Sequence, residues 1–148
     1  MNTISTLNNL IETLKDGQNG FADAAQDVPD ADLKSLFLGY SQQRAQFAGE
    51  LQGLVKSLGE DEPTDSGSLG GAIHRGWIDL KAALSTRDNH AILSECERGE
   101  DVAVAAYKKA LEQKELPVNV IDIVQTQYAT VKATHDHIRN LRDSLVAA

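Results

Sequence analysis

The stretch Glu95-Cys96-Glu97-Arg98-Gly99-Glu100-Asp101 decides the fold that this sequence predicts. It lies near the start of a segment in which apolar or small residues recur every three or four positions, the spacing of one face of an α-helix. That face comprises Leu93, Cys96, Glu100, Ala103, Tyr107 and Ala110. Glu100 is the one charged residue on it. Because a buried carboxylate costs several kcal/mol unless it is paired, protonated or metal-bound, the partner of Glu100 is the first question to answer.

Length and composition predict a single all-α domain. The chain has 148 residues, of which 41% are hydrophobic and 24% charged, ordinary values for a globular protein. A chain of this length buries roughly 68–70% of its unfolded surface. There are three prolines, and Ala, Leu, Gln, Glu and Asp abound, a mixture that favours helix.

The charge and the cysteine count exclude several classes of function. A net charge of −8 disfavours binding to nucleic acid or to anionic membranes. Cys96 is the single cysteine, so there is no intramolecular disulfide, as is typical of a reducing compartment. The first residues resemble no signal sequence, and no stretch approaches the ~20 apolar residues of a membrane helix. We expect a cytoplasmic protein.

Apolar periodicity predicts five helices, over about residues 3–27, 31–58, 69–84, 90–113 and 118–145. The third and fourth are either two parts of one bent rod or separate helices. The acidic loop of residues 59–68 is long for a bundle, which favours a crossover that leaves its flanking helices parallel. A weak internal repeat relates residues 3–58 to residues 90–145. The sequence therefore predicts two helical hairpins packed as a four-helix bundle, with an extra helical segment around Trp77.

Three charged or polar residues interrupt the apolar faces, each near the middle of its helix: Arg44, Glu100 and His135. If the four long helices form a bundle, all three project inward at a similar height. One solution is a central polar cluster, in which Arg44 grips Glu100 with two hydrogen bonds and His135 bonds a free carboxylate lone pair.

The other solution is a metal site, because carboxylates and imidazoles inside a four-helix bundle bind iron or manganese. A di-iron centre needs a Glu from each of two helices and a Glu-x-x-His from each of the others. Here Lys132 stands three residues before His135, and the second helix offers Arg44 and Phe47 instead. A mononuclear site of Glu97, Glu100 and His135 is the remaining metal hypothesis.

Other candidate sites carry weaker signals. The residues His74, Arg75, Trp77 and Asp79 are candidates for a surface groove, although a lone Trp on a helical stripe is more often part of the core. Cys96 lies on an apolar face and is expected to be inert packing. The sequence contains no CxxC or HExxH motif and no assignable catalytic triad.

Taken together, these motifs resemble a bacterial ferritin-like four-helix-bundle family of unknown function. The resemblance covers nearly the whole chain and is carried by Lys15-Asp16-Gly17, Gly20-Phe21, Arg44 to Leu51, Gly67-Ser68-Leu69, His74 to Lys81, Glu95 to Asp101 and His135-Asp136. It implies a cytoplasmic ferritin-like bundle, often linked to stress or stationary phase, without an established activity. The wider superfamily includes iron-oxidising and iron-storing members, and against their pattern Glu100 and His135 fall on ligand positions.

From these observations we expect a non-enzymatic ferritin-like bundle with a stress-related binding role, in which Arg44, Glu100 and His135 replace a di-iron site. No cofactor is expected. A homo-oligomer or a protein partner is compatible with the sequence. Two alternatives stay open, an iron- or manganese-binding redox or storage bundle using Glu100 and His135, and a helical adaptor for a protein partner.

Overall fold

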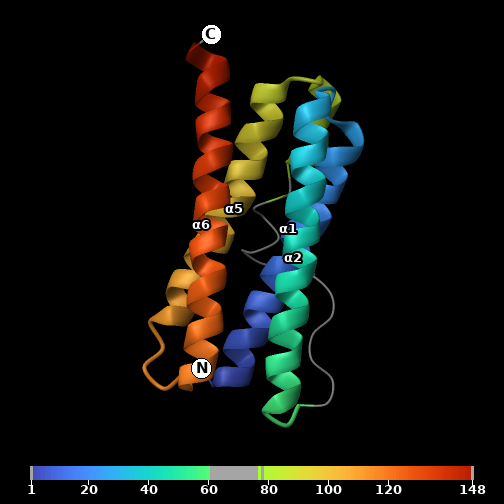
Figure 1. Ribbon diagram of the computed structural model, residues 1–148. Coiled ribbons are helices and arrows are strands. Elements are labelled where there is room, and N and C mark those ends of the chain that lie inside the picture. Colours follow the sequence, from blue (N-terminus) through green and yellow to red (C-terminus); the bar gives the residue numbers. More distant parts are fainter. Residues whose placement is uncertain (1, 61–76, 78, 148) are drawn as a thin grey trace.

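The computed structural model describes residues 2–60, 77 and 79–147, and the regular structure of that part is entirely helical. Its five helices are α1 (Thr3–Asp27), α2 (Ala31–Ser57), α4 (Leu80–Thr86), α5 (Asn89–Leu111) and α6 (Val118–Ala147) (Figure 1). The predicted all-α class is confirmed. The four long helices begin and end within two residues of the expected positions.

Side-chain caps explain why three of these helices begin where they do. The Asn2 side chain accepts a hydrogen bond from the Ser5 amide at 2.8 Å, and Asp30 accepts one from the Leu33 amide at 2.9 Å. Asp88 does the same for the amide of His90 at the start of α5. Each bond satisfies a backbone N–H that has no partner inside the helix.

The helix expected over residues 69–84 is confirmed from Leu80 onward, but in the described part of the chain it begins later than predicted. Trp77 and Asp79 lie in turns, α4 begins at Leu80, and residues 69–76 and 78 lie outside the described part of the chain. The spacing of Trp77, Leu80 and Leu84 imitates a helical stripe because all three side chains pack against the bundle. Arg87 adopts a left-handed conformation (φ 54°) between α4 and α5, so these are two separate helices.

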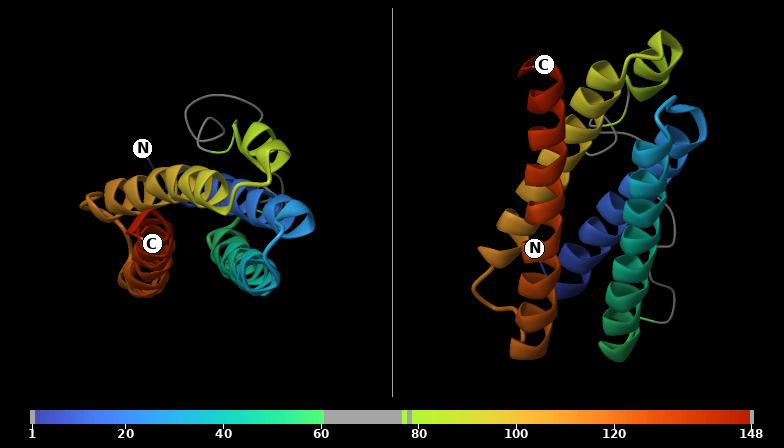
Figure 2. Two further views of the ribbon diagram at one scale, coloured as in Figure 1. Left: turned by 90° about the horizontal axis from the view of Figure 1, so that it is seen from above. Right: turned by 45° about the horizontal axis from the view of Figure 1, so that its top comes forward.

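The long helices form two antiparallel hairpins. α1 packs most extensively on α2 and α5 on α6, while α1 and α5 join the hairpins. α2 and α5 run in the same direction (Figure 1). Seen from above, α1 and α5 form one layer, α2 and α6 cover one face of it, and α4 lies on the opposite face (Figure 2). The contact between α2 and α6 is slight.

The hydrophobic core consists of two clusters, one toward each end of the long helices. The first includes Leu10, Leu51 and Tyr107, and the second includes Phe21, Phe37 and Cys96 together with the apolar side chains of α4. Along α2 and α5, Arg44 and Glu100 lie between the two clusters. None of the described helices combines the length and the apolarity that crossing a bilayer requires.

Candidate functional site

Arg44 of α2 and Glu100 of α5 form a buried ion pair at the centre of the molecule. Arg44 Nη1 donates to Glu100 Oε2 at 2.6 Å, and Nη2 donates to Oε1 at 2.5 Å. The two side chains are 1% and 0% exposed. This is the two-bond pairing expected from the sequence, and it engages both oxygens of the carboxylate.

The remaining surface of the guanidinium is also occupied. Its Nε donates to Gln43 at 3.3 Å, and its carbon lies 5.5 Å from the centre of the Phe21 ring, a cation–π distance. Burial acts to lower the pKa of Arg44, but the charge and hydrogen bonds of Glu100 outweigh it and raise that pKa above its ordinary value. Arg44 is therefore a permanent cation, even at the centre of the molecule.

The same carboxylate affects two neighbouring groups. Burial raises the pKa of the Cys96 thiol well above its ordinary value, and the nearby charges of Glu100 and Glu95 raise it further. Burial also raises the pKa of Tyr40 to about 12, Glu100 adding to this effect and Arg44 opposing it. Both groups stay protonated at neutral pH, so neither supplies a nucleophile or a base.

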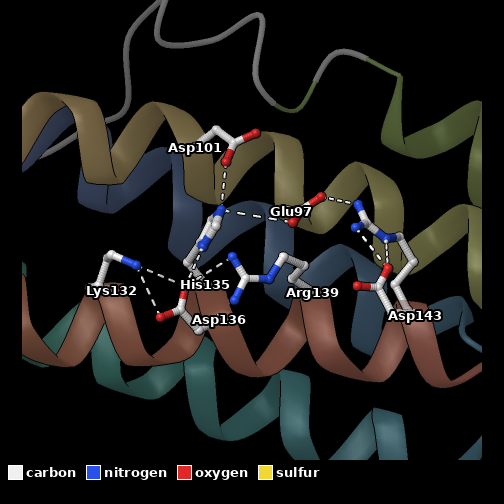
Figure 3. Close-up of polar contacts among 8 residues, drawn as sticks. Glu97, Asp101, Lys132, His135, Asp136, Arg139 and Asp143 are labelled. Atoms are coloured by element: carbon white, nitrogen blue, oxygen red, sulfur yellow. Dashed lines mark hydrogen bonds and ion pairs between the residues drawn. The ribbon is translucent and has the colours of Figure 1, made fainter.

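His135 does not join the central pair, and this part of the sequence-based cluster was wrong. Its Nε2 lies 2.6 Å from Asp101 Oδ1 and 3.9 Å from Glu97 Oε2, and its Nδ1 lies 3.0 Å from Asp136 Oδ1 (Figure 3). The imidazole is 13% exposed, at the boundary between α5 and α6. Glu100 is not among its partners.

His135 lies away from Arg44 and Glu100 because α6 turns a different face toward the core than the one predicted. A face of α6 that turns His135 inward would also turn Tyr128 inward, but Gln127 and Thr134, one residue earlier, are the buried side chains. Val124, Val131 and Ile138 belong to both faces and are buried as expected. Because only every second position of the face shifts by one residue, the face turns by about half of the roughly 100° between successive residues, which moves His135 to the side that meets α5.

Eight ionisable side chains, His135 among them, lie together along this boundary, and we call them the charged seam. They are Glu97, Asp101, Lys132, His135, Asp136, Arg139, Arg142 and Asp143 (Figure 3). Lys132 lies 3.0 Å from Asp136, and Arg142 pairs with both Glu97 and Asp143. The hydrogen bond from His135, then that from Lys132, lowers the pKa of Asp136 to about 2.

The proposed ligands of a mononuclear metal site are not brought together. Arg44 occupies both oxygens of Glu100, and Arg142 binds one oxygen of Glu97. Across the described ranges, no three or more His, Cys, Asp or Glu side chains form a group that could hold a metal ion.

Sequence reasoning missed a second polar connection, which joins three of the long helices. The Tyr107 hydroxyl donates to Gln127 at 2.7 Å, and the Gln127 amide nitrogen lies 3.2 Å from Glu50 Oε1 and 3.3 Å from the Phe47 carbonyl. Gln127 is 2% exposed. The signal was weak, because Gln127 stands next to Tyr128, which fits the apolar spacing better.

Trp77 lies in a notch formed by two glycines on different helices. A Cβ atom at Gly20 of α1 or at Gly99 of α5 would lie 2.3 or 2.2 Å from indole atoms, so no larger residue fits while Trp77 is in place. The indole meets the Phe21 ring edge-on at 5.1 Å between centres. Trp77 is therefore docked in the core, with Asp79 beside it accepting from Arg98 at 2.9 Å. His74 and Arg75 lie outside the described residues.

A groove of about 320 Å³ runs beside this notch, between α1 and α4. Trp77, Leu80 and Leu84 give it apolar walls. The polar side chains that line it are Asp16, Asn19, Asp23, Gln26, Asp27 and Lys81. The groove is thus amphipathic, with more acidic than basic groups around it.

Comparison with known proteins gives a family. No curated protein sequence matches this chain. A family model described as "Domain of unknown function (DUF2383)" matches residues 2–113, a segment that contains the Arg44–Glu100 pair and the Gly20–Trp77–Gly99 notch and ends before α6. Since the match covers well over half of the sequence, the chain belongs to the DUF2383 family.

Proposed function

We propose that this protein is a non-enzymatic, ferritin-like binding bundle in which the Arg44–Glu100 pair takes the place of a di-iron centre. The observation that carries the proposal is the complete use of Glu100: both its oxygens accept from one guanidinium, and neither side chain reaches solvent. A metal ion at this position would have to displace a buried cation. Leaving Arg44 buried without its partner costs several kcal/mol.

The ferritin-like part of the proposal is supported by the path of the chain. Two antiparallel hairpins joined by one long connection, with α2 and α5 parallel, match the connectivity of ferritin-like folds. A cytoplasmic location and a stress-related role belong to the same proposal. The buried free thiol of Cys96 supports the first, and the family resemblance supports the second.

Elemental analysis of protein purified without chelator tests the absence of a metal centre. We expect less than stoichiometric iron, manganese or zinc, and a melting temperature that adding ferrous, manganous or zinc ions leaves unchanged. Stoichiometric metal together with a raised melting temperature would overturn the proposal, provided that the Glu100→Gln variant loses both effects.

For the binding role, we propose the groove between α1 and α4 as the contact surface and a basic, amphipathic segment of a protein partner as the occupant. The acidic side chains Asp23 and Asp27 would attract such a segment, and Leu80, Leu84 and Trp77 would bury its apolar side chains. This is the adaptor alternative, and the charge and apolar walls of the groove favour it.

A synthetic lysine- and leucine-rich helical peptide tests this surface, with the fluorescence of the single tryptophan, Trp77, as the readout. We expect saturable binding that the double change Asp23→Asn and Asp27→Asn weakens. The matched control, Glu112→Gln with Asp122→Asn, removes the same charge from exposed positions away from the groove. Equal weakening in both variants would show non-specific attraction and contradict the groove.

A further inference from the structure

Both ring nitrogens of His135 lie within hydrogen-bond distance of a carboxylate oxygen, an arrangement that favours two ring protons. Its Nε2 is 2.6 Å from Asp101 Oδ1 and its Nδ1 is 3.0 Å from Asp136 Oδ1, and ionised carboxylates only accept hydrogen bonds. A neutral imidazole carries one N–H and satisfies one of these contacts. An imidazolium carries two and satisfies both.

The other charges of the seam, three of which (Glu97, Asp101 and Asp136) contact His135 directly, lead to the same conclusion. In the described part of the chain, α5 contributes Glu97 and Asp101, and α6 contributes Lys132, Asp136, Arg139, Arg142 and Asp143. Four of these groups are anionic and three are cationic. Only with His135 as a fourth cation does the charged seam balance. A neutral ring would leave one excess negative charge among closely spaced carboxylates.

The charged seam matters most for the second half of α6, where apolar packing is sparse. From Thr134 to Leu145, Ile138 is the one fully buried hydrophobic side chain. The ion pairs that join α5 to α6 among the described residues are His135–Asp101, His135–Glu97 and Arg142–Glu97. Two of the three depend on His135.

We propose that His135 is a proton-dependent clamp, which holds the second half of α6 against α5 while both ring nitrogens are protonated and releases it when one proton is lost. The contribution of the clamp is complete at low pH and is lost as pH rises and the ring becomes neutral. Histidine is the side chain whose unperturbed charge change lies closest to neutral pH. Asp136 stays ionised throughout, since its pKa is held at about 2.

Two measurements on the full chain test the clamp. Nitrogen-15 NMR of the histidine rings at pH 5.5 should show both nitrogens of His135 protonated. Amide hydrogen exchange of residues 134–145, referenced to a peptide from α1 in the same sample, should show about a tenfold loss of protection between pH 5.5 and pH 8. In the His135→Gln variant, protection should be low and independent of pH.

His137 supplies the matched control. It lies two residues further along α6 and bonds the Tyr40 hydroxyl at 2.7 Å, outside the charged seam. His137→Gln should keep the pH-dependent protection of the wild-type chain. The proposal is overturned if His135 is a neutral single tautomer at pH 5.5, or if His135→Gln keeps the same pH dependence as the wild type.

Discussion

Each charge of the Arg44–Glu100 pair is tolerated at the centre of the molecule because the other is present. Because both side chains are buried, water cannot take the place of a lost partner. The apolar clusters begin directly beyond the two residues along α2 and α5. Such a pair fixes the register of two helices more than it adds stability relative to an apolar pair of similar volume.

Removing one member of the pair should therefore be much worse than removing both. We expect Glu100→Leu to lower the free energy of unfolding by roughly 3–5 kcal/mol, because it leaves Arg44 buried without a counter-charge. The double variant Arg44→Met with Glu100→Leu should recover most of that loss. Urea unfolding followed by circular dichroism measures both, and a Glu100→Leu protein as stable as the wild type would show that the pair is not buried in solution.

The raised pKa of Tyr40 predicts how the free energy of unfolding changes in alkaline solution. Its pKa in the folded protein is about 12, against 10.0 for a free tyrosine, mainly because burial disfavours the phenolate. The folded state holds this proton more tightly, so the stability that Tyr40 contributes is present below pH 10 and declines as pH rises toward 12. The free energy of unfolding should fall more between pH 9.5 and pH 11.5 in the wild type than in Tyr40→Phe. Equal falls would contradict the raised pKa.

At the scale of the helices, the spacing of apolar residues predicts boundaries better than faces. The four long helices could be predicted from the regular spacing of their apolar residues. The pairing of Arg44 with Glu100 could be predicted because each is a charged residue that interrupts this spacing near the middle of its helix. The position of His135 could not. Stripes through Gln127 and through Tyr128 share the same three apolar residues of α6, and packing against α5 and α2 decides between them.

Trp77 shows a second limit of the same kind. Its spacing from Leu80 and Leu84 fits a helix, but the notch that holds it is made by glycines about 60 residues before it and about 20 after it in the sequence. Glycine in a helix ordinarily indicates low helix propensity. Only tertiary structure shows that Gly20 and Gly99 face each other across the same indole ring.

The notch predicts opposite effects for glycines within helices. Gly99→Ala should destabilise the protein by about 1–3 kcal/mol and shift Trp77 fluorescence to the red, since the new methyl group displaces the indole toward solvent. Gly53→Ala is the control: nothing lies within 4 Å of the added carbon, and alanine favours the helix, so stability should rise by about 0.4–1 kcal/mol with no spectral change. Unchanged fluorescence in Gly99→Ala would place Trp77 outside the notch.

At the scale of the whole molecule, the two hydrophobic clusters depend on each other. Every long helix contributes to both clusters, and the ion pair ties α2 to α5 between them. The clamp at His135 acts on the second half of α6, which lies against one face of the α1–α5 layer (Figure 2). We therefore expect local opening of the second half of α6, which contributes Ile138 to the cluster that contains Cys96, but no separate unfolding of the rest of that cluster.

Cys96 allows this cooperativity to be measured. Its thiol is fully buried, and burial raises its pKa well above the ordinary value, so the folded protein should not react with a disulfide reagent at pH 8. Labelling should occur through global unfolding, and the free energy derived from its rate should agree with that from urea unfolding to within about 1 kcal/mol. Glu100→Leu should lower both values equally, whereas His135→Gln should change the labelling rate only as far as it changes global stability. Labelling that is much faster than global unfolding, and insensitive to urea, would show that the end of the bundle containing α4 opens on its own.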